Sequence, residues 1–176
     1  MNGSHGQINL LESTEAFKAE FLSLLDEYQR AGENWSNAEL AQKDFIAYVR
    51  QLHDQSQGRN LPAGHVPVTT FWLVWNNQMI LGESRLRHAL TPALEAFGGH
   101  IGYVIRPSQR RKGYGTLILK LTLEKASAIG IQRVRVTCDT DNIGSALIIE
   151  RNGGILSDYS VNPRNGKCIS QYWIEI

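Results

Sequence analysis

The sequence predicts an α/β domain in which helices flank a mixed, mostly antiparallel, twisted sheet. The chain of 176 residues has about the length of one domain. Its 42% hydrophobic and 20% charged residues are typical of a folded globular protein. The hydrophobic periodicity changes along the chain, from helical spacing in the first third to strands that alternate with helices afterwards. We therefore treat residues 1–176 as a single domain.

The N-terminal segment, about residues 13–55, is predicted to form two helices. Apolar side chains in Ser13–Arg30 recur at intervals of three and four, as on one face of a helix, and a glycine follows. Ser36 and Glu39 have the spacing of a capping box, which marks the start of the second helix. This second helix is expected to continue to the end of the segment.

A hairpin is predicted after a connecting stretch, residues 56–68, that contains glycine and two prolines but no period. Phe71–Trp75 is aromatic and β-branched, and Met79–Leu86 is a second extended run. The pair Asn76-Asn77 lies between them, and asparagine tolerates the left-handed conformation that tight turns require. This hairpin begins the part of the chain, about residues 71–176, that carries the functional motif.

The remaining elements alternate between strands and helices. We expect a short helix or loop at Thr91–Phe97, a strand at His100–Ile105, a helix at Thr116–Ile129, a strand at Val134–Cys138, a helix at Ile143–Asn152, and strands at Ile155–Tyr159 and Ile169–Ile176. No internal repeat or low-complexity tract is present in the sequence.

Charge and cysteine content exclude several classes of protein. Eighteen basic and seventeen acidic residues give a net charge of +1, so no global field attracts nucleic acid or a membrane surface. The segment Met1–Leu10 lacks the basic and apolar regions of a signal peptide. Cys138 and Cys168 match no metal-ligand spacing, and so sparse a pair suits a reducing compartment. We expect a cytoplasmic protein without a structural metal.

The stretch from Ile101 to Thr116 predicts an anion-binding loop. An apolar strand ends at a proline, the basic residues Arg110–Lys112 follow, and Gly113 and Gly115 open a helix. Glycines let backbone N–H groups converge, and the helix N-terminus carries partial positive charge, so a pyrophosphate fits there. A solvated basic turn is the alternative. The spacing is neither that of a Walker loop nor that of a dinucleotide-binding turn.

The sequence Arg110-Arg111-Lys112-Gly113-Tyr114-Gly115 resembles the acetyl-CoA signature [RQ]-x-x-G-x-[GA] of the GNAT (GCN5-related N-acetyltransferase) superfamily. The resemblance covers about Phe71 to Ile176 and includes Asn142 and Ser145 at the start of a later helix. It implies the acyl-CoA N-acyltransferase fold, from which we take the strand order. The two N-terminal helices would then cover the substrate end.

The same resemblance implies a cofactor site and an activity. The expected acetyl-CoA contacts are Tyr103, Val104 and Ile105 for the pantetheine arm, Arg110, Arg111, Lys112, Gly113, Tyr114, Gly115 and Thr116 for the pyrophosphate, and Asn142 and Ser145 near the thiol end. A helix N-cap is an equally good interpretation of Asn142. The implied reaction is direct attack of a primary amine on acetyl-CoA, with no metal. The acceptor amine would belong to a small molecule or a peptide. A homodimer is one possible oligomeric state.

The residues that move protons are less well defined by the sequence. The family usually has a tyrosine acid where this chain has Ile149, and Tyr159 and Tyr172 are candidate replacements. The candidate catalytic bases are His100, which titrates near neutral pH, and Glu83 in the preceding strand. A structural hydrogen bond is the alternative for His100, and a solvated edge or an ion pair is the alternative for Glu83.

Two other classes of function are kept as alternatives. The missing tyrosine is compatible with a non-catalytic acyl-CoA-binding or regulatory domain. A nucleic-acid module that binds phosphates through Arg110–Lys112 is disfavoured by the net charge and by the lack of interleaved aromatic residues. The acceptor amine is expected to be selected by the N-terminal helices and by the segments Gln57–Thr70 and Ala89–Gly99.

Overall fold

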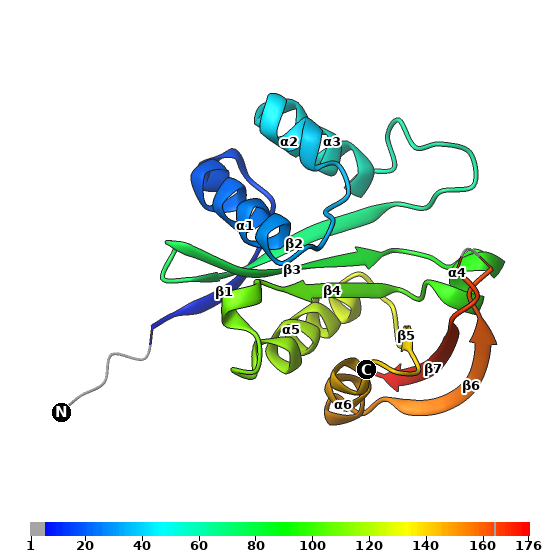
Figure 1. The fold of residues 1–176 in the computed structure, drawn as a ribbon. Coiled ribbons are helices and arrows are strands. Elements are labelled where there is room, and N and C mark those ends of the chain that lie inside the picture. Colours follow the sequence, from blue (N-terminus) through cyan, green and yellow to red (C-terminus); the bar gives the residue numbers. More distant parts are fainter. Residues whose placement is uncertain (1–5, 164) are drawn as a thin grey trace.

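The strands of the protein form two antiparallel sheets, and helices lie on both faces of the larger one (Figure 1). The computed structural model describes residues 6–163 and 165–176. The larger sheet has the order β1 (Ile8–Glu12), β2 (Val68–Trp75), β3 (Met79–Arg87) and β4 (Ile101–Ile105). The smaller sheet has the order β5 (Arg133–Asp139), β7 (Cys168–Glu175) and β6 (Ile155–Val161). The predicted class, antiparallel sheet flanked by helices, is confirmed, with the strands divided between two sheets.

The helices separate into two groups. The helices are α1 (Lys18–Arg30), α2 (Ala38–Lys43), α3 (Phe45–Ser56), α4 (Pro92–Phe97), α5 (Tyr114–Ala128) and α6 (Ile143–Arg151), with 3-10 turns at Glu15–Phe17 and Pro107–Gln109. In Figure 1, α1, α2 and α3 lie on one side of the larger sheet, whereas α5 lies on the other. Within the described residues, no helix is long and apolar enough to span a bilayer.

The central hairpin separates two hydrophobic cores. Trp72 and Val74 of β2 pack against α1 and α3, whereas Phe71 and Leu73 belong to the core that includes α5. A strand that is buried on both faces needs apolar residues at consecutive positions, which explains the apolar run Phe71–Trp75 of β2. Asn76 and Asn77 have φ angles of 51° and 54°, as the predicted tight turn requires.

At the N-terminal end the structure differs from the sequence analysis in three respects. The sequence analysis assigns no element before residue 13, whereas Ile8–Glu12 forms strand β1; residues 1–5 of the segment Met1–Leu10 lie outside the described residues. The expected second helix is interrupted at Asp44, whose backbone leaves the helical region and whose carboxylate accepts a hydrogen bond from Ala47 N at 2.9 Å. An aspartate that caps a new helix in this way competes with continuation of the old one. The capping box is absent, since Asn37 in a left-handed conformation starts α2.

Hydrogen bonds from backbone N–H groups join the two sheets at the start of β4. The His100 N–H donates to the Arg135 carbonyl at 2.7 Å, and the Arg135 N–H donates to His100 Nδ1 at 2.9 Å. Beyond this point β4 pairs only with β3, and β5 pairs only with β7. The opening between β4 and β5 is bordered by α5 and α6, and it creates the site described next.

Candidate active site

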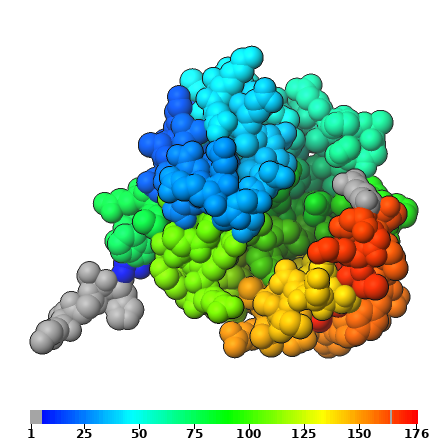
Figure 2. Space-filling view, viewed as in Figure 1, coloured from blue at the N-terminus to red at the C-terminus, as the bar shows by residue number. Residues whose placement is uncertain are grey.

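A groove of about 640 Å³ lies between β4, the start of α5 and α6. Most of the residues predicted to contact a cofactor line it: Tyr103, Val104, Ile105, Arg110, Arg111, Gly113, Gly115, Thr116, Asn142 and Ser145. Lys112 and Tyr114 are outside the lining, and Tyr114 packs partly against the core. In Figure 2 the light green residues of α5 and the gold residues of α6 border this groove.

One end of the groove presents four successive backbone donors. Gly113, with a φ of 86°, starts the fifteen-residue helix α5. Within the described part of the chain, the N–H groups of residues 113–116 donate to no protein acceptor. Free N–H groups and the helix dipole together attract an anion. The loop therefore offers the phosphate cradle that its glycines predict.

Gly115 has a packing role as well. A Cβ built at this position would lie 2.5 Å from Ile148 Cδ1 and 3.3 Å from Ile148 Cγ1. The missing side chain therefore lets α6 approach α5 closely along the groove. At Gly113, by contrast, a Cβ would meet nothing within 4 Å, so the left-handed backbone is the reason for glycine there.

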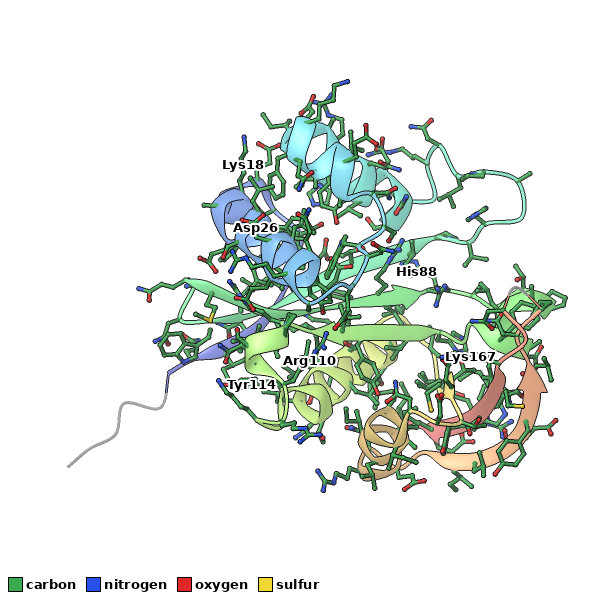
Figure 3. The ribbon with its side chains drawn as sticks, in the orientation of Figure 1. Lys18, Asp26, His88, Arg110, Tyr114 and Lys167 are labelled. Atoms are coloured by element: carbon green, nitrogen blue, oxygen red, sulfur yellow. The ribbon has the colours of Figure 1, made fainter. Side chains whose placement is uncertain are left out.

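The three basic residues of the loop differ in their partners. Arg110 donates two hydrogen bonds to the Glu33 carboxylate at 2.6 and 2.8 Å and one to the Ile105 carbonyl at 3.1 Å. The pKa of Glu33 is lowered by its hydrogen bond to Arg110. The label in Figure 3 lies between α1 and the start of α5, the two elements that Arg110 connects. Lys112 Nζ donates to a neighbouring glutamine at 3.0 Å. Arg111, among the described residues, makes no hydrogen bond or ion pair and is free to meet an anion.

The edge of β4 supplies backbone groups to the groove. Arg87 N–H bonds the His100 carbonyl and Arg106 N–H bonds the Leu81 carbonyl, so the even-numbered residues of β4 face β3. Hydrogen-bonding groups alternate along an antiparallel strand, so those of Tyr103 point into the opening. An extended amide-containing arm fits along this edge.

The thiol end predicted from Asn142 and Ser145 contains a hydroxyl pair. The Asn142 side chain caps α6 by accepting from Ser145 N at 3.0 Å, which confirms the N-cap interpretation. The Tyr103 hydroxyl lies 2.9 Å from Ser145 Oγ and connects β4 to α6. Burial raises the pKa of Tyr103 to about 12, so this hydroxyl is protonated at neutral pH.

Glu83 is a buried carboxylate of β3 next to β4, and it does not itself line the groove. Its register partner is Val104, so both side chains lie on the face covered by α1 and α3. Trp72 Nε1 donates to Glu83 Oε2 at 3.0 Å. Burial raises the pKa of Glu83 to about 7, because desolvation outweighs the Trp72 hydrogen bond and the nearby Arg85 charge.

His100 lies at the junction of the two sheets, unlike Glu83, which lies within β3. Its Nδ1 and its backbone groups are all used to join β3, β4 and β5, and it does not line the groove. Burial, together with the charge of Arg87, lowers the pKa of His100, which favours the neutral ring. The structure thus gives His100 the contacts of a positioning residue where the two sheets meet.

The position of the usual tyrosine acid is closed to solvent. Ile149 is 0% exposed in the core beneath α6, and Tyr172 is also a core residue. Tyr159 is 62% exposed on β6, and neither tyrosine lines the groove. In the described ranges, no group of three His, Cys, Asp or Glu side chains could hold a metal ion.

Two groove contacts were not predicted from the sequence. Glu33 lines the groove and fixes Arg110, and Tyr28 donates its hydroxyl hydrogen to the Ile105 carbonyl at 3.0 Å. Both come from the end of α1 and its following turn, more than 70 residues from their partners. No local pattern in the sequence marks a contact of this range.

Comparison with known proteins agrees with this geometry. Residues 11–155 match the family model described as "Acetyltransferase (GNAT) domain". No curated protein matches the sequence.

Solved structures share the fold at low sequence identity. RimL, a ribosomal L7/L12 α-N-protein acetyltransferase in complex with coenzyme A, is 18% identical, with a TM-score of 0.71 over 96% of this chain and 94% of that one. The microcin C7 self-immunity acetyltransferase MccE, in complex with acetyl-CoA and AMP, is 17% identical, with a TM-score of 0.72 over 97% and 93%. The ribosomal-protein-S5-alanine acetyltransferase of Vibrio fischeri is 15% identical, with a TM-score of 0.69 over 99% and 95%.

The family model covers most of the chain, and the structure superposes on solved acetyltransferases over nearly its whole length. The chain therefore belongs to the GNAT acetyltransferase family and is an acyltransferase.

Proposed function

We propose that the protein transfers an acetyl group from acetyl-CoA to a primary amine by direct attack. The observation that carries this proposal is the row of four free N–H groups, residues 113–116, at one end of the opening between β4 and β5. A pyrophosphate at this row would leave the rest of a CoA molecule to follow the exposed edge of β4.

Each part of the groove then has an assigned contact. Arg111 and Lys112 add positive charge to the phosphate cradle, and Arg110 acts indirectly by fixing the loop to Glu33. The backbone groups of Tyr103 and the N–H of Ile105, which point away from β3, bond the amides of the pantetheine arm, and Val104 contributes its side chain to the groove wall. The acetyl thioester lies toward Ser145, which lines the groove at the start of α6.

Glu83 is the base that we propose for the attacking amine. An alkyl ammonium with a pKa near 10.4 must lose a proton at a cost of roughly 4 to 5 kcal/mol at pH 7, whereas an α-amine near 8 costs about 1 kcal/mol. A carboxylate whose pKa is about 7 is a better acceptor than an ordinary one. Trp72 binds Oε2, so Oε1 is the atom that receives the proton, either directly or through one water.

The leaving thiolate needs little assistance. A thiol with a pKa near 8.5 loses about 2 kcal/mol by leaving without a proton at pH 7. The Tyr103 and Ser145 hydroxyls, 2.9 Å apart, can donate hydrogen bonds to the sulfur, and water can supply the proton. In this proposal the hydroxyl pair does the work of the tyrosine acid that the family usually has at the position of Ile149.

Calorimetry with acetyl-CoA, CoA and a DNA duplex, followed by thiol release across a panel of amines, tests the proposal. We expect binding of both CoA species, no duplex binding, and thiol release with at least one amine. Binding without thiol release would favour a regulatory acyl-CoA-binding domain, and duplex binding without CoA affinity would favour a nucleic-acid module. Cys138→Ala and Cys168→Ala should both retain turnover, because direct attack needs no enzyme nucleophile.

A further inference from the structure

A second cavity of about 630 Å³ lies on the other face of the larger sheet, between α3 and the segment 57–68. It is open to solvent on one side, and its lining comes from α3, the connecting segment, Asn37 before α2, the first residue of β2, and Arg85 of β3. Its size is in the range of small-molecule sites. The polar side chains that line this cavity indicate which class of ligand it could bind.

Three buried side-chain polar atoms have no partner in the described residues, and each belongs to a residue that lines this cavity or pairs with one that does. They are Gln55 Oε1, Thr70 Oγ1 and Arg85 Nε. Gln55 and Arg85 line the same cavity, and Thr70 is the register partner of Arg85 on β2. Unpaired buried groups are costly, and three of them at one site indicate a ligand that satisfies them.

Arg85 differs from the other arginines near the sheets. Arg87, two residues later on the same strand, donates to two carbonyls, and Arg106 is held by two glutamates and a serine. Within residues 6–163 and 165–176, the Arg85 guanidinium makes neither a hydrogen bond nor an ion pair, although it is half-buried. The charge of Arg85 acts on the Glu83 carboxylate two residues earlier, but no acceptor among the described residues takes a hydrogen bond from the Arg85 guanidinium, so an anionic ligand could supply that acceptor.

The side chains that line the cavity carry a net positive charge, as Arg85 does. Arg50, Arg59 and Arg85 line it together with one acid, Asp54. Asp54 is already bound to Arg59 at 2.8 Å, so its charge is offset. The net positive lining excludes a polyamine and favours a molecule that carries a carboxylate or a phosphate.

The cavity also adjoins the expected position of the acetyl group. Arg85 is in register with Gly102 of β4, the residue directly before Tyr103 of the groove. A Cβ at Gly102 would meet nothing within 4 Å, so the space above this residue is open. Glu83, two residues before Arg85, has its side chain on the same face of the sheet.

We propose that this cavity binds the acceptor, and that the acceptor is an amine bearing an anionic group which Arg85 recognises. This inference rests on the proposed acetyl transfer. The carboxylate or phosphate bonds the Arg85 guanidinium and the Thr70 hydroxyl. An N–H of the acceptor bonds the Gln55 carbonyl oxygen, and the reacting amine lies over Gly102, toward Glu83.

Binding of matched amines tests the inference without relying on turnover. The probes are β-alanine against β-alaninamide and O-phosphoethanolamine against ethanolamine, measured by calorimetry with and without CoA. We expect the protein to bind at least one anionic member about 10- to 100-fold more tightly than its neutral partner, the range for a hydrogen bond to a charged group. The two pairs distinguish a carboxylate from a phosphate.

Arg85→Gln should abolish this preference and leave the affinity for acetyl-CoA unchanged. Arg85→Lys should restore part of it, and Arg133→Gln, which removes an exposed arginine on β5, should leave it intact. Thermal melts of each variant show whether it folds. Equal or unmeasurable affinities within both pairs, or a preference that survives Arg85→Gln, would overturn the inference. Anion preference in binding without thiol release for any amine would support the Arg85 site and count against acetyl transfer.

Discussion

Replacing Glu83 by glutamine separates a proton-transfer role from a structural one. The carboxylate is buried beside Trp72, and its pKa is raised from 4.5 to about 7. If Glu83 accepts a proton from the amine, kcat/KM should rise with pH through about 7, because only the ionised form is basic. Glu83→Gln should remove this limb and lower kcat/KM by about 10²- to 10⁴-fold, the usual effect of a positioned base.

Glu83→Gln, which should lower kcat/KM, should raise the free energy of unfolding above pH 7. An unfolded glutamate ionises near 4.5, whereas Glu83 in the folded protein keeps its proton to about pH 7. The folded state therefore binds more protons between these values, and the free energy of unfolding falls as pH rises through them. The loss is on the order of 3 kcal/mol, from 1.36 kcal/mol for each pH unit. Glu83→Gln, which never ionises, should be more stable than the wild type at pH 8 and similar at pH 4.

Chemical denaturation at pH 4 and pH 8 and thiol release from pH 5.5 to 9 measure both effects. Glu124→Gln, at an exposed position on α5, is the matched control and should change neither. An unchanged pH profile in Glu83→Gln would refute the assignment of Glu83 as base. A loss of stability at pH 8 would refute the argument that burial of the ionised carboxylate is unfavourable.

The remaining predictions concern the groove and the junction of the sheets. Gly113→Val should raise the acetyl-CoA Kd at least 10-fold in calorimetry, because a β-branched residue is strained at a φ of 86° and displaces the N–H groups of the cradle. A wild-type Kd would remove the phosphate-loop assignment. Arg111→Ala should weaken acetyl-CoA binding and flatten its salt dependence between 50 and 200 mM salt, since one cation near the phosphates is lost; an unchanged salt slope would place Arg111 away from the phosphates. His100→Ala should lower the free energy of unfolding by about 1–3 kcal/mol, because the buried Arg135 N–H loses its acceptor. The pH profile of kcat/KM should keep its limb in this variant, and disappearance of the limb would restore His100 as the base.

Features that depend on neighbours a few residues apart could be predicted from the amino-acid sequence. The hairpin follows from two apolar runs around Asn76-Asn77, and the phosphate loop follows from a strand, a basic stretch and Gly113 before a helix. The N-cap at Asn142 follows from the same kind of local signal. Such features are set by backbone preferences and by spacings of three and four residues, which a single sequence contains.

The contacts among these residues could not be predicted in the same way, because their partners are far apart in the sequence. Arg110 is assigned to phosphate by its motif, yet its partner is Glu33, 77 residues away. The hydrogen bond from Arg135 N to His100 Nδ1 depends on β5 lying beside the start of β4, which no local pattern indicates. Arg85 carries no motif in the sequence, and only the packing of α3 and the connecting segment over the sheet makes it part of a cavity wall, without a hydrogen-bond partner among the described residues. Contacts of this range depend on how the elements pack and on strand order and register; a one-residue change in the register of β3, for example, would move the Arg85 side chain to the other face of the sheet.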